Sequence, residues 1–220
     1  MAMSLPAMMS ILSNTLNPKD NDMKKLLAAA ALSLCFSLPA QAAELFGIEF
    51  GSPASSYAIS GEALAEQGKM KMYKVVPPKP EAIFPGYALT AYDGKVVRIT
   101  AFSRADYSND GASTRKAFAD MVQKLSKRFG GPVVFDEDLA TDSKLTAPDQ
   151  WKQSLLDSER IVQSNWVIED VKDGNDLEAV WLEANAIPMK PESATFLTLS
   201  ARVKDFPLYE QKAAQEAKIK

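Results

Sequence analysis

The sequence predicts an α+β fold, in which a largely antiparallel sheet of about five to six strands carries one long amphipathic helix and shorter helices packed on it. Three observations predict this fold. Short β-prone runs alternate with turn residues, one segment near residues 114–129 has apolar residues at helical spacing, and hairpin signals join neighbouring runs. The chain is 46% hydrophobic and 24% charged, as in an ordinary globular protein.

The first elements after residue 43 are predicted to be short. Glu44–Phe50 favours a short strand, and Ser60–Gln67 favours one or two turns of helix that stop at Gly68. Met70–Val76 is predicted to be a strand. Pro77–Pro80 ends it, because proline offers no backbone N–H to a neighbouring strand.

A β-hairpin is predicted next, with Tyr87–Tyr92 and Lys95–Arg104 flanking Asp93-Gly94. A two-residue Asp-Gly loop favours a type I′ turn, because both central residues need a positive φ. The turn predicts the pairs Ala91–Val96 and Leu89–Arg98.

Both faces of this hairpin are largely apolar. One face is predicted to carry Tyr87, Leu89, Ala91, Val96 and Phe102, and the other Ala88, Tyr92, Val97, Ile99 and Ala101. Either protein covers both faces, or one of them is a binding surface.

The strongest helix is predicted over Thr114–Phe129, with Ser113 or Thr114 as its N-cap. Its apolar side chains fall on one face: Phe118, Met121, Val122, Leu125 and Phe129. Gly130-Gly131-Pro132 ends it. This pattern is typical of a helix that covers a core.

The rest of the chain predicts more strands. We expect a short strand Val133–Phe135, an acidic loop Asp136–Asp142 and a short helix Asp149–Ser158. A hairpin of Arg160–Glu169 and Leu177–Asn185 around Asp173-Gly174 is predicted next. The last elements are a strand Thr195–Lys204, with Leu197, Leu199, Ala201 and Val203 facing inward, and a frayed helix from Leu208. If Asp173-Gly174 is a two-residue turn, Trp166 and Trp181 face each other across the hairpin. Structural packing is the favoured role of this pair, and an aromatic surface for a sugar, lipid or peptide partner is the alternative.

The N-terminus has the layout of a secretory signal peptide. Met23-Lys24-Lys25 is positively charged, Leu26–Leu38 is apolar, and Ala40-Gln41-Ala42 is an A-x-A cleavage site. The apolar run is shorter than the about 20 residues that span a bilayer. We therefore expect residues 1–22 to be a disordered gene-start extension, 23–42 a signal peptide cleaved after Ala42, and 43–220 a single α+β domain in the periplasm.

Cys35 leaves a lipoprotein as the alternative, with an acylated cysteine as the first residue. Leu34 precedes it, where a lipobox usually has a small residue, so cleavage after Ala42 is favoured. Cys35 is the one cysteine of the chain. An exported domain without disulfides depends on its hydrophobic core for stability.

The composition of residues 43–220 excludes several classes of chemistry. They contain no histidine and no cysteine, which excludes Ser-His-Asp and Cys-His catalysis and imidazole or thiolate zinc sites. The chain carries a net charge of −3 and no basic tract, so we expect no nucleic-acid partner. We expect no cofactor and no transmembrane segment after residue 42.

Carboxylates are the remaining candidates for acid–base chemistry, at Asp136, Glu137, Asp138 and Asp142. A solvated acidic loop is the favoured interpretation, and an enzyme acting on cell-wall glycan or lipid is the alternative. An EF-hand is excluded, because counting from Asp136 places Thr141 at the required glycine and Ala147 at the required glutamate. The pairs Ser126-Lys127 and Ser143-Lys144 lack the buried surroundings that would activate a lysine.

A non-catalytic binding or interaction module of the periplasm is the function that these features favour. Its candidate interaction surface is aromatic: Tyr92, Phe102, Trp166 and Trp181. The partner would be a protein, peptide, glycan or lipid of the cell envelope. An inhibitor or immunity-type protein that blocks a periplasmic partner is a further alternative.

Two short series of residues, each containing aromatic side chains, suggest a relationship to other proteins. They are Leu45-Phe-Gly-Ile48 and the series Trp151, Leu155, Glu159-Arg160 and Trp166. In these residues the chain resembles a group of uncharacterised exported proteins of Gram-negative bacteria. The resemblance implies a fold and a compartment, and no activity.

Overall fold

The computed structural model describes residues 44–168, 174, 176–189 and 192–218. Residues Ala42–Lys220 form one compact unit. The predicted extension 1–22, the signal peptide 23–42, Cys35 and the turn residue Asp173 lie outside the described residues.

Eight strands form one antiparallel sheet in the order β3-β4-β5-β6-β10-β9-β8-β7. Their bounds are β3 Ala58–Gln67, β4 Met70–Val76, β5 Gly86–Tyr92, β6 Lys95–Phe102, β7 Val134–Leu139, β8 Arg160–Val167, β9 Leu177–Ile187 and β10 Ala194–Val203. A separate two-stranded ribbon pairs β1 (Glu44–Leu45) with β2 (Ile48–Glu49). The helices are η2 Ala54–Ser56, α3 Ala112–Phe129, η3 Pro148–Gln150, α4 Trp151–Leu156 and α5 Phe206–Ala217.

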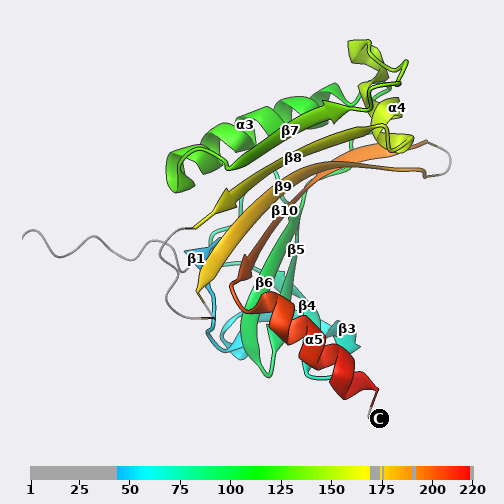
Figure 1. The fold of residues 1–220 in the computed structure, drawn as a ribbon. Coiled ribbons are helices and arrows are strands. Elements are labelled where there is room, and N and C mark those ends of the chain that lie inside the picture. The colour runs from blue at the N-terminus through cyan, green and yellow to red at the C-terminus, as the bar shows by residue number, and fades with distance from the viewer. Residues whose placement is uncertain (1–43, 169–173, 175, 190–191, 219–220) are drawn as a thin grey trace, which may run out of the picture. The chain divides into compact units, whose positions relative to one another are not determined.

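The predicted architecture, a sheet of five to six strands with one long helix packed on it, is therefore wrong. The sheet consists of two four-stranded meanders, β3 to β6 and β7 to β10, which join edge to edge where β6 pairs with β10. The connection between the meanders contains α3, which packs on β9 and β10 (Figure 1). Two strands differ most from the prediction: β3 forms where a helix is predicted, and β7 extends the short strand predicted over Val133–Phe135 into the acidic residues.

Strand β3 replaces the helix predicted over Ser60–Gln67. Alanine and glutamate in this segment favour a helix by themselves. Pairing with β4 overrides that preference, and a register shift between Ser60 and Ala65 takes up the residues that do not fit the ladder. Gly68, predicted as a helix stop, lies in the β3–β4 turn with φ +55°.

Strand β7 replaces most of the predicted acidic loop. Asp136, Glu137 and Asp138 pair with Gln163, Val162 and Ile161 of β8. Acidic residues are rare in central strands, but β7 is the last strand of the sheet. At an edge, exposed charges are tolerated and oppose pairing with another chain.

The β5–β6 hairpin has the predicted turn but only part of the predicted register. Asp93 and Gly94 have φ values of 49° and 77°, and Ala91 pairs with Val96 as expected. A bulge between Thr90 and Ala91 then shifts the ladder by one residue, so that Leu89 pairs with Ile99 and not with Arg98. The shift moves Phe102 to the opposite face from Leu89.

The predicted pairing of Trp166 with Trp181 is also wrong. Trp166 pairs with Val180, and Trp181 pairs with Asn165, one residue out of the expected register. Since neighbouring strand residues alternate between faces, the two indoles lie on opposite sides of the sheet. Trp166 is 1% exposed and donates a hydrogen bond from Nε1 to the carbonyl oxygen of Gly130 at 3.0 Å.

One face of the sheet carries the core. It includes Leu89, Ile99, Ala201, Val180 and Trp166, which follow one another across β5, β6, β10, β9 and β8. The inward residues predicted on the last strand are buried as expected: Leu197, Leu199, Ala201 and Val203. Helices α3 and α4 cover this face over the second meander.

The N-terminal end of α3 is held by Asp106. Its carboxylate accepts hydrogen bonds from the backbone N–H groups of Ser108 at 2.9 Å and Thr114 at 3.3 Å. Burial by itself would raise the pKa of Asp106, but these bonds and the nearby Lys152 ammonium hold that pKa below its usual value. The charged carboxylate thus satisfies helix N–H groups that have no partner within the helix.

Helix α5 lies beside β3 and β4 (Figure 1). Tyr209 stacks on Tyr92 with ring centroids 4.8 Å apart, and Glu216 accepts a hydrogen bond from the Tyr92 hydroxyl at 3.1 Å. Glu216 also accepts one from the backbone N–H of Lys69 at 2.8 Å. These contacts place α5 on the side of β5 opposite Leu89, the face that lacks the core.

Candidate functional site

The face opposite the core carries polar, aromatic and small apolar side chains and is only partly covered. We call it the open face. Ala88 and Ala179 are buried on it. Its polar and aromatic residues lie at alternate positions of β5, β6, β10, β9 and β8, and include Thr90, Tyr92, Arg98, Thr100, Phe102, Thr198, Ser200, Arg202, Trp181, Glu183 and Asn165. Helix α5 covers the part near Tyr92, while Glu183 and Phe102 are exposed.

Trp181 lies near the middle of β9 on this face. Its neighbours across the ladders are Ser200 of β10 and Asn165 of β8. The guanidinium of Arg202 lies over its ring, 4.5 Å from the ring centroid. A cation over an indole is attracted by the negative ring face. The indole is partly exposed and held flat under a cation.

Two arginines are direct partners at the junction of the meanders, since Arg98 of β6 pairs with Arg202 of β10. Like charges directly opposite each other destabilise a sheet unless they are compensated. Glu178 lies 3.7 Å from Arg202. Arg98 has no ion pair with any described residue, but donates a hydrogen bond to Ser200 and lies over the Phe206 ring.

Two buried polar atoms beside Trp181 have no hydrogen-bond partner among the described residues. They are Oδ1 of Asn165 and Nε of Arg202. Buried polar atoms in proteins are usually paired, so an unpaired one calls for an explanation. We name the group Trp181, Asn165, Ser200, Arg98 and Arg202 the Trp181 patch.

The four aromatic residues predicted as an interaction surface do not form one cluster. Trp181 and Phe102 lie on the open face, and Phe102 is 39% exposed. Tyr92 is on the same face but stacks on α5, and Trp166 belongs to the core. The pair of Arg98 and Arg202 could not be predicted from the sequence, because nothing in the local sequence indicates that β6 and β10 are neighbours.

The acidic residues do not converge. Glu137 and Asp138 are consecutive in β7, so their side chains point to opposite faces of the sheet. Glu137 lies 3.7 Å from the guanidinium of Arg160. Asp142 is exposed in the following turn, as is Lys144, and Lys127 is exposed on α3. Glu137 and Asp138 therefore do not form a facing pair of carboxylates of the kind that glycoside cleavage requires.

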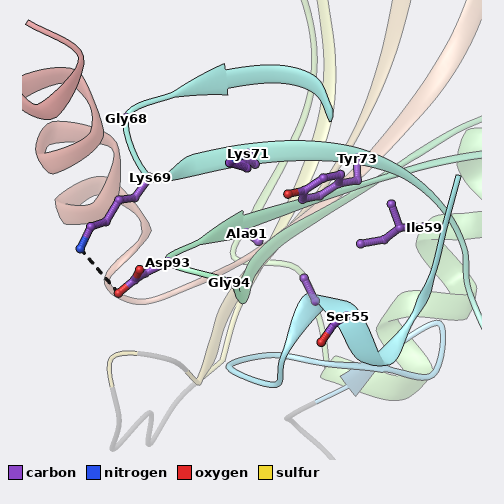
Figure 2. A pocket seen from close by; sticks show the side chains of 10 residues that line it. Ser55, Ile59, Gly68, Lys69, Lys71, Tyr73, Ala91, Asp93 and Gly94 are labelled. Carbon is purple, nitrogen blue, oxygen red and sulfur yellow. Dashed lines mark ion pairs between the residues drawn. The ribbon is translucent and has the colours of Figure 1, made fainter. Parts of the chain in front are cut away.

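A pocket of about 480 Å³ lies on the core face of the sheet, between η2 and strands β4 and β5. Figure 2 shows Ser55 of η2 at one side of it and Lys71 and Tyr73 of β4 at the other. Ile59, Ala91 and the ion-paired Lys69 and Asp93 also line it. The volume is within the range of about 300–1,000 Å³ that is usual for ligand pockets.

Within the described part of the chain, no three His, Cys, Asp or Glu residues are grouped so as to hold a metal ion. The helices described there are all too short or too polar to cross a membrane. Comparison with known proteins found no family model, no curated protein and no solved structure that matches this chain.

Proposed function

We propose that this protein is a non-catalytic interaction module of the periplasm, which binds an acidic segment of a partner protein through the Trp181 patch. One observation carries the proposal: two register-paired arginines lie on the open face of the sheet, and one of them, Arg202, lies over the ring of the partly exposed Trp181. Tryptophan and arginine are the residues most often found at the energetic centre of protein interfaces.

The chemistry of the patch supports an acidic protein partner over a glycan. A carboxylate of the partner would reduce the repulsion between the guanidinium groups of Arg98 and Arg202. A sugar ring would need the face of Trp181, and the Arg202 guanidinium already lies on that ring. An inhibitor of a periplasmic protein would be one form of this module.

We predict that a photo-crosslinking amino acid at the exposed position Glu183 captures one protein in living cells. The substitution Trp181→Ala should lower the yield of that adduct by about tenfold or more, because loss of an interface anchor costs about 2 kcal/mol or more. Added salt should also lower the yield, since the attraction is between charges. Mass spectrometry of the crosslinked band measures both effects.

Two matched controls accompany this measurement. The same probe at Lys127, exposed on α3, should give no such adduct, and Phe135→Ala should leave the Glu183 adduct unchanged. Phe135 is an aromatic residue of β7 and is 56% exposed. It pairs with Ser164, which pairs with the core residue Leu182, so it lies on the face opposite the Trp181 patch. If Phe135→Ala lowers the yield as much as Trp181→Ala does, or if no adduct forms at Glu183, the proposed function is wrong.

The same proposal includes export with cleavage after Ala42. We predict that protein isolated from the cell envelope begins at Ala43, because charge, apolar run and A-x-A site occur in the order that the secretion machinery reads. N-terminal sequencing or intact mass measures this. An N-terminus at Met1 or Met23 would contradict export by cleavage, and a diacylated Cys35 would establish the lipoprotein alternative.

A further inference from the structure

The pocket beside η2 has an apolar floor that continues the hydrophobic core. Ala54 and Ala91 are buried, and Ile59 and Tyr73 pack against the core with part of their surface exposed. Register pairing places these side chains on the core face, since Tyr73 lies opposite Leu89. The floor therefore suits the hydrocarbon part of a ligand.

Lys71 forms the cationic part of the wall. It pairs with Ala91 across the β4–β5 ladder, so its side chain shares a face with the pocket floor. Its ammonium donates a hydrogen bond to the Glu66 carboxylate at 3.0 Å. An ammonium has three N–H donors, so this bond leaves capacity for a second carboxylate.

Lys69 is less suited to take a ligand. Its ammonium lies 3.7 Å from the Asp93 carboxylate, an ion pair that Figure 2 shows at the rim of the pocket. Its backbone is also tied at both ends, by hydrogen bonds from its N–H to Glu216 and from the N–H of Asp93 to its carbonyl oxygen. Both ammonium groups have a carboxylate partner, but Lys69 lies in the β3–β4 turn at the rim, whereas Lys71 lies in β4 on the same face as the apolar floor. Lys71 is therefore the group around which an anionic ligand would be oriented.

We propose that this pocket binds a small amphiphilic carboxylate, with its hydrocarbon part on Ile59, Tyr73 and Ala91 and its carboxylate on the ammonium of Lys71. Lys71 already holds a carboxylate in the required geometry, that of Glu66. The Asp93 carboxylate at the rim is already paired with Lys69, and a purely polar anion would leave the apolar floor in contact with water. This proposal does not depend on the Trp181 patch, which lies on the opposite face.

Three probes with the same hydrocarbon chain test the proposal by calorimetry on the purified protein: octanoate, octanol and octylamine. Octanoate should bind about tenfold more tightly than octylamine, the difference expected of one charge-assisted hydrogen bond. Lys71→Met should weaken octanoate binding to the level of octanol and leave octanol binding unchanged, because it keeps the aliphatic stem and removes the charge.

The matched control is Lys74→Met. Lys74 is exposed on the same strand and points to the opposite face, so this variant makes the same change in net charge outside the pocket. It should leave all three affinities unchanged. Ser55→Phe, at an exposed position of η2, should block the hollow and weaken every probe.

Several results would overturn the proposal. They are equal affinities for octanoate and octylamine, equal effects of Lys71→Met and Lys74→Met, or no binding of octanoate at millimolar concentration. Circular dichroism spectra and melting temperatures of the variants establish that each is folded, so that a lost affinity reports on the pocket.

Discussion

Replacement of Trp151 by alanine is expected to lower the free energy of unfolding by about 3–5 kcal/mol, the usual cost of removing a buried aromatic side chain. Trp151 begins α4 and is 1% exposed. Its ring fills the space beside Gly111, where an added Cβ would lie 2.8 Å from Cε3 of the indole. Since the gap would be bordered by backbone on the Gly111 side, the neighbours have little freedom to close it.

Trp151→Phe separates ring packing from hydrogen bonding. The Nε1 atom of Trp151 has no hydrogen-bond partner among the described residues, so phenylalanine loses volume but no hydrogen bond. We expect a cost of about 1–2 kcal/mol for this variant. Urea denaturation followed by circular dichroism measures both values, because the signal does not depend on tryptophan fluorescence.

Trp181→Ala is the matched control, as it removes an indole that is partly exposed. Its loss of the cation–π contact with Arg202 should cost about 1 kcal/mol. If Trp151→Ala costs no more than Trp181→Ala, the Trp151 ring does not fill a tightly packed site beside Gly111.

Replacement of Lys152 by methionine is expected to cost about 2–3 kcal/mol, since it removes two charge-assisted hydrogen bonds in a buried site. Lys152 is 6% exposed, and its ammonium donates to the carbonyl oxygens of Ser108 at 2.9 Å and Ser193 at 2.6 Å. These carbonyls belong to the segments before α3 and before β10. Lys152 therefore joins three parts of the chain that are distant in sequence.

Lys152→Ala should cost more, about 3–5 kcal/mol, because it also removes the buried aliphatic stem. Near this lysine, the backbone N–H of Asp106 donates to the carbonyl oxygen of Thr195 at 2.7 Å, and the N–H of Thr195 donates to that of Asp106 at 2.9 Å. In either variant, amide hydrogen exchange at Asp106 and Thr195 should become faster, which localises the effect.

The control for Lys152 is Lys116→Met, which changes the same charge on the surface of α3. Lys116 forms an exposed pair with Asp120, one turn along the helix, and such pairs contribute about 0.5 kcal/mol or less. Equal stabilities of Lys152→Met and the unmodified protein would contradict the prediction. The desolvation of the ammonium would then offset its two hydrogen bonds.

Elements with strong local signals could be predicted from sequence. The helix signal over Thr114–Phe129 lies within α3, and the Asp93-Gly94 turn has positive φ at both residues. Alternation in the last strand identified its buried residues, from Leu197 to Val203. In each case, residues that are close together in sequence determine the local conformation.

The candidate site could be predicted only in part. Trp181 was found as an exposed-aromatic candidate, but its contact with Arg202 depends on the β9–β10 register. The pocket combines η2 with β4 and β5, and its key residue Lys71 is one lysine among many in the sequence. No spacing in the chain indicates that Ser55 and Lys71 line the same hollow.

By itself, the sequence determined where local conformation is strongly biased: the long helix, the type I′ turn, the apolar strands and the absence of histidine and cysteine after residue 42. Tertiary structure decided the number of strands, the registers of both hairpins and the faces on which Phe102, Trp166 and Trp181 lie. The physical reason is the two-residue period of a strand. A single bulge or a slip of one residue exchanges the two faces, and only the summed packing of the whole sheet selects between them.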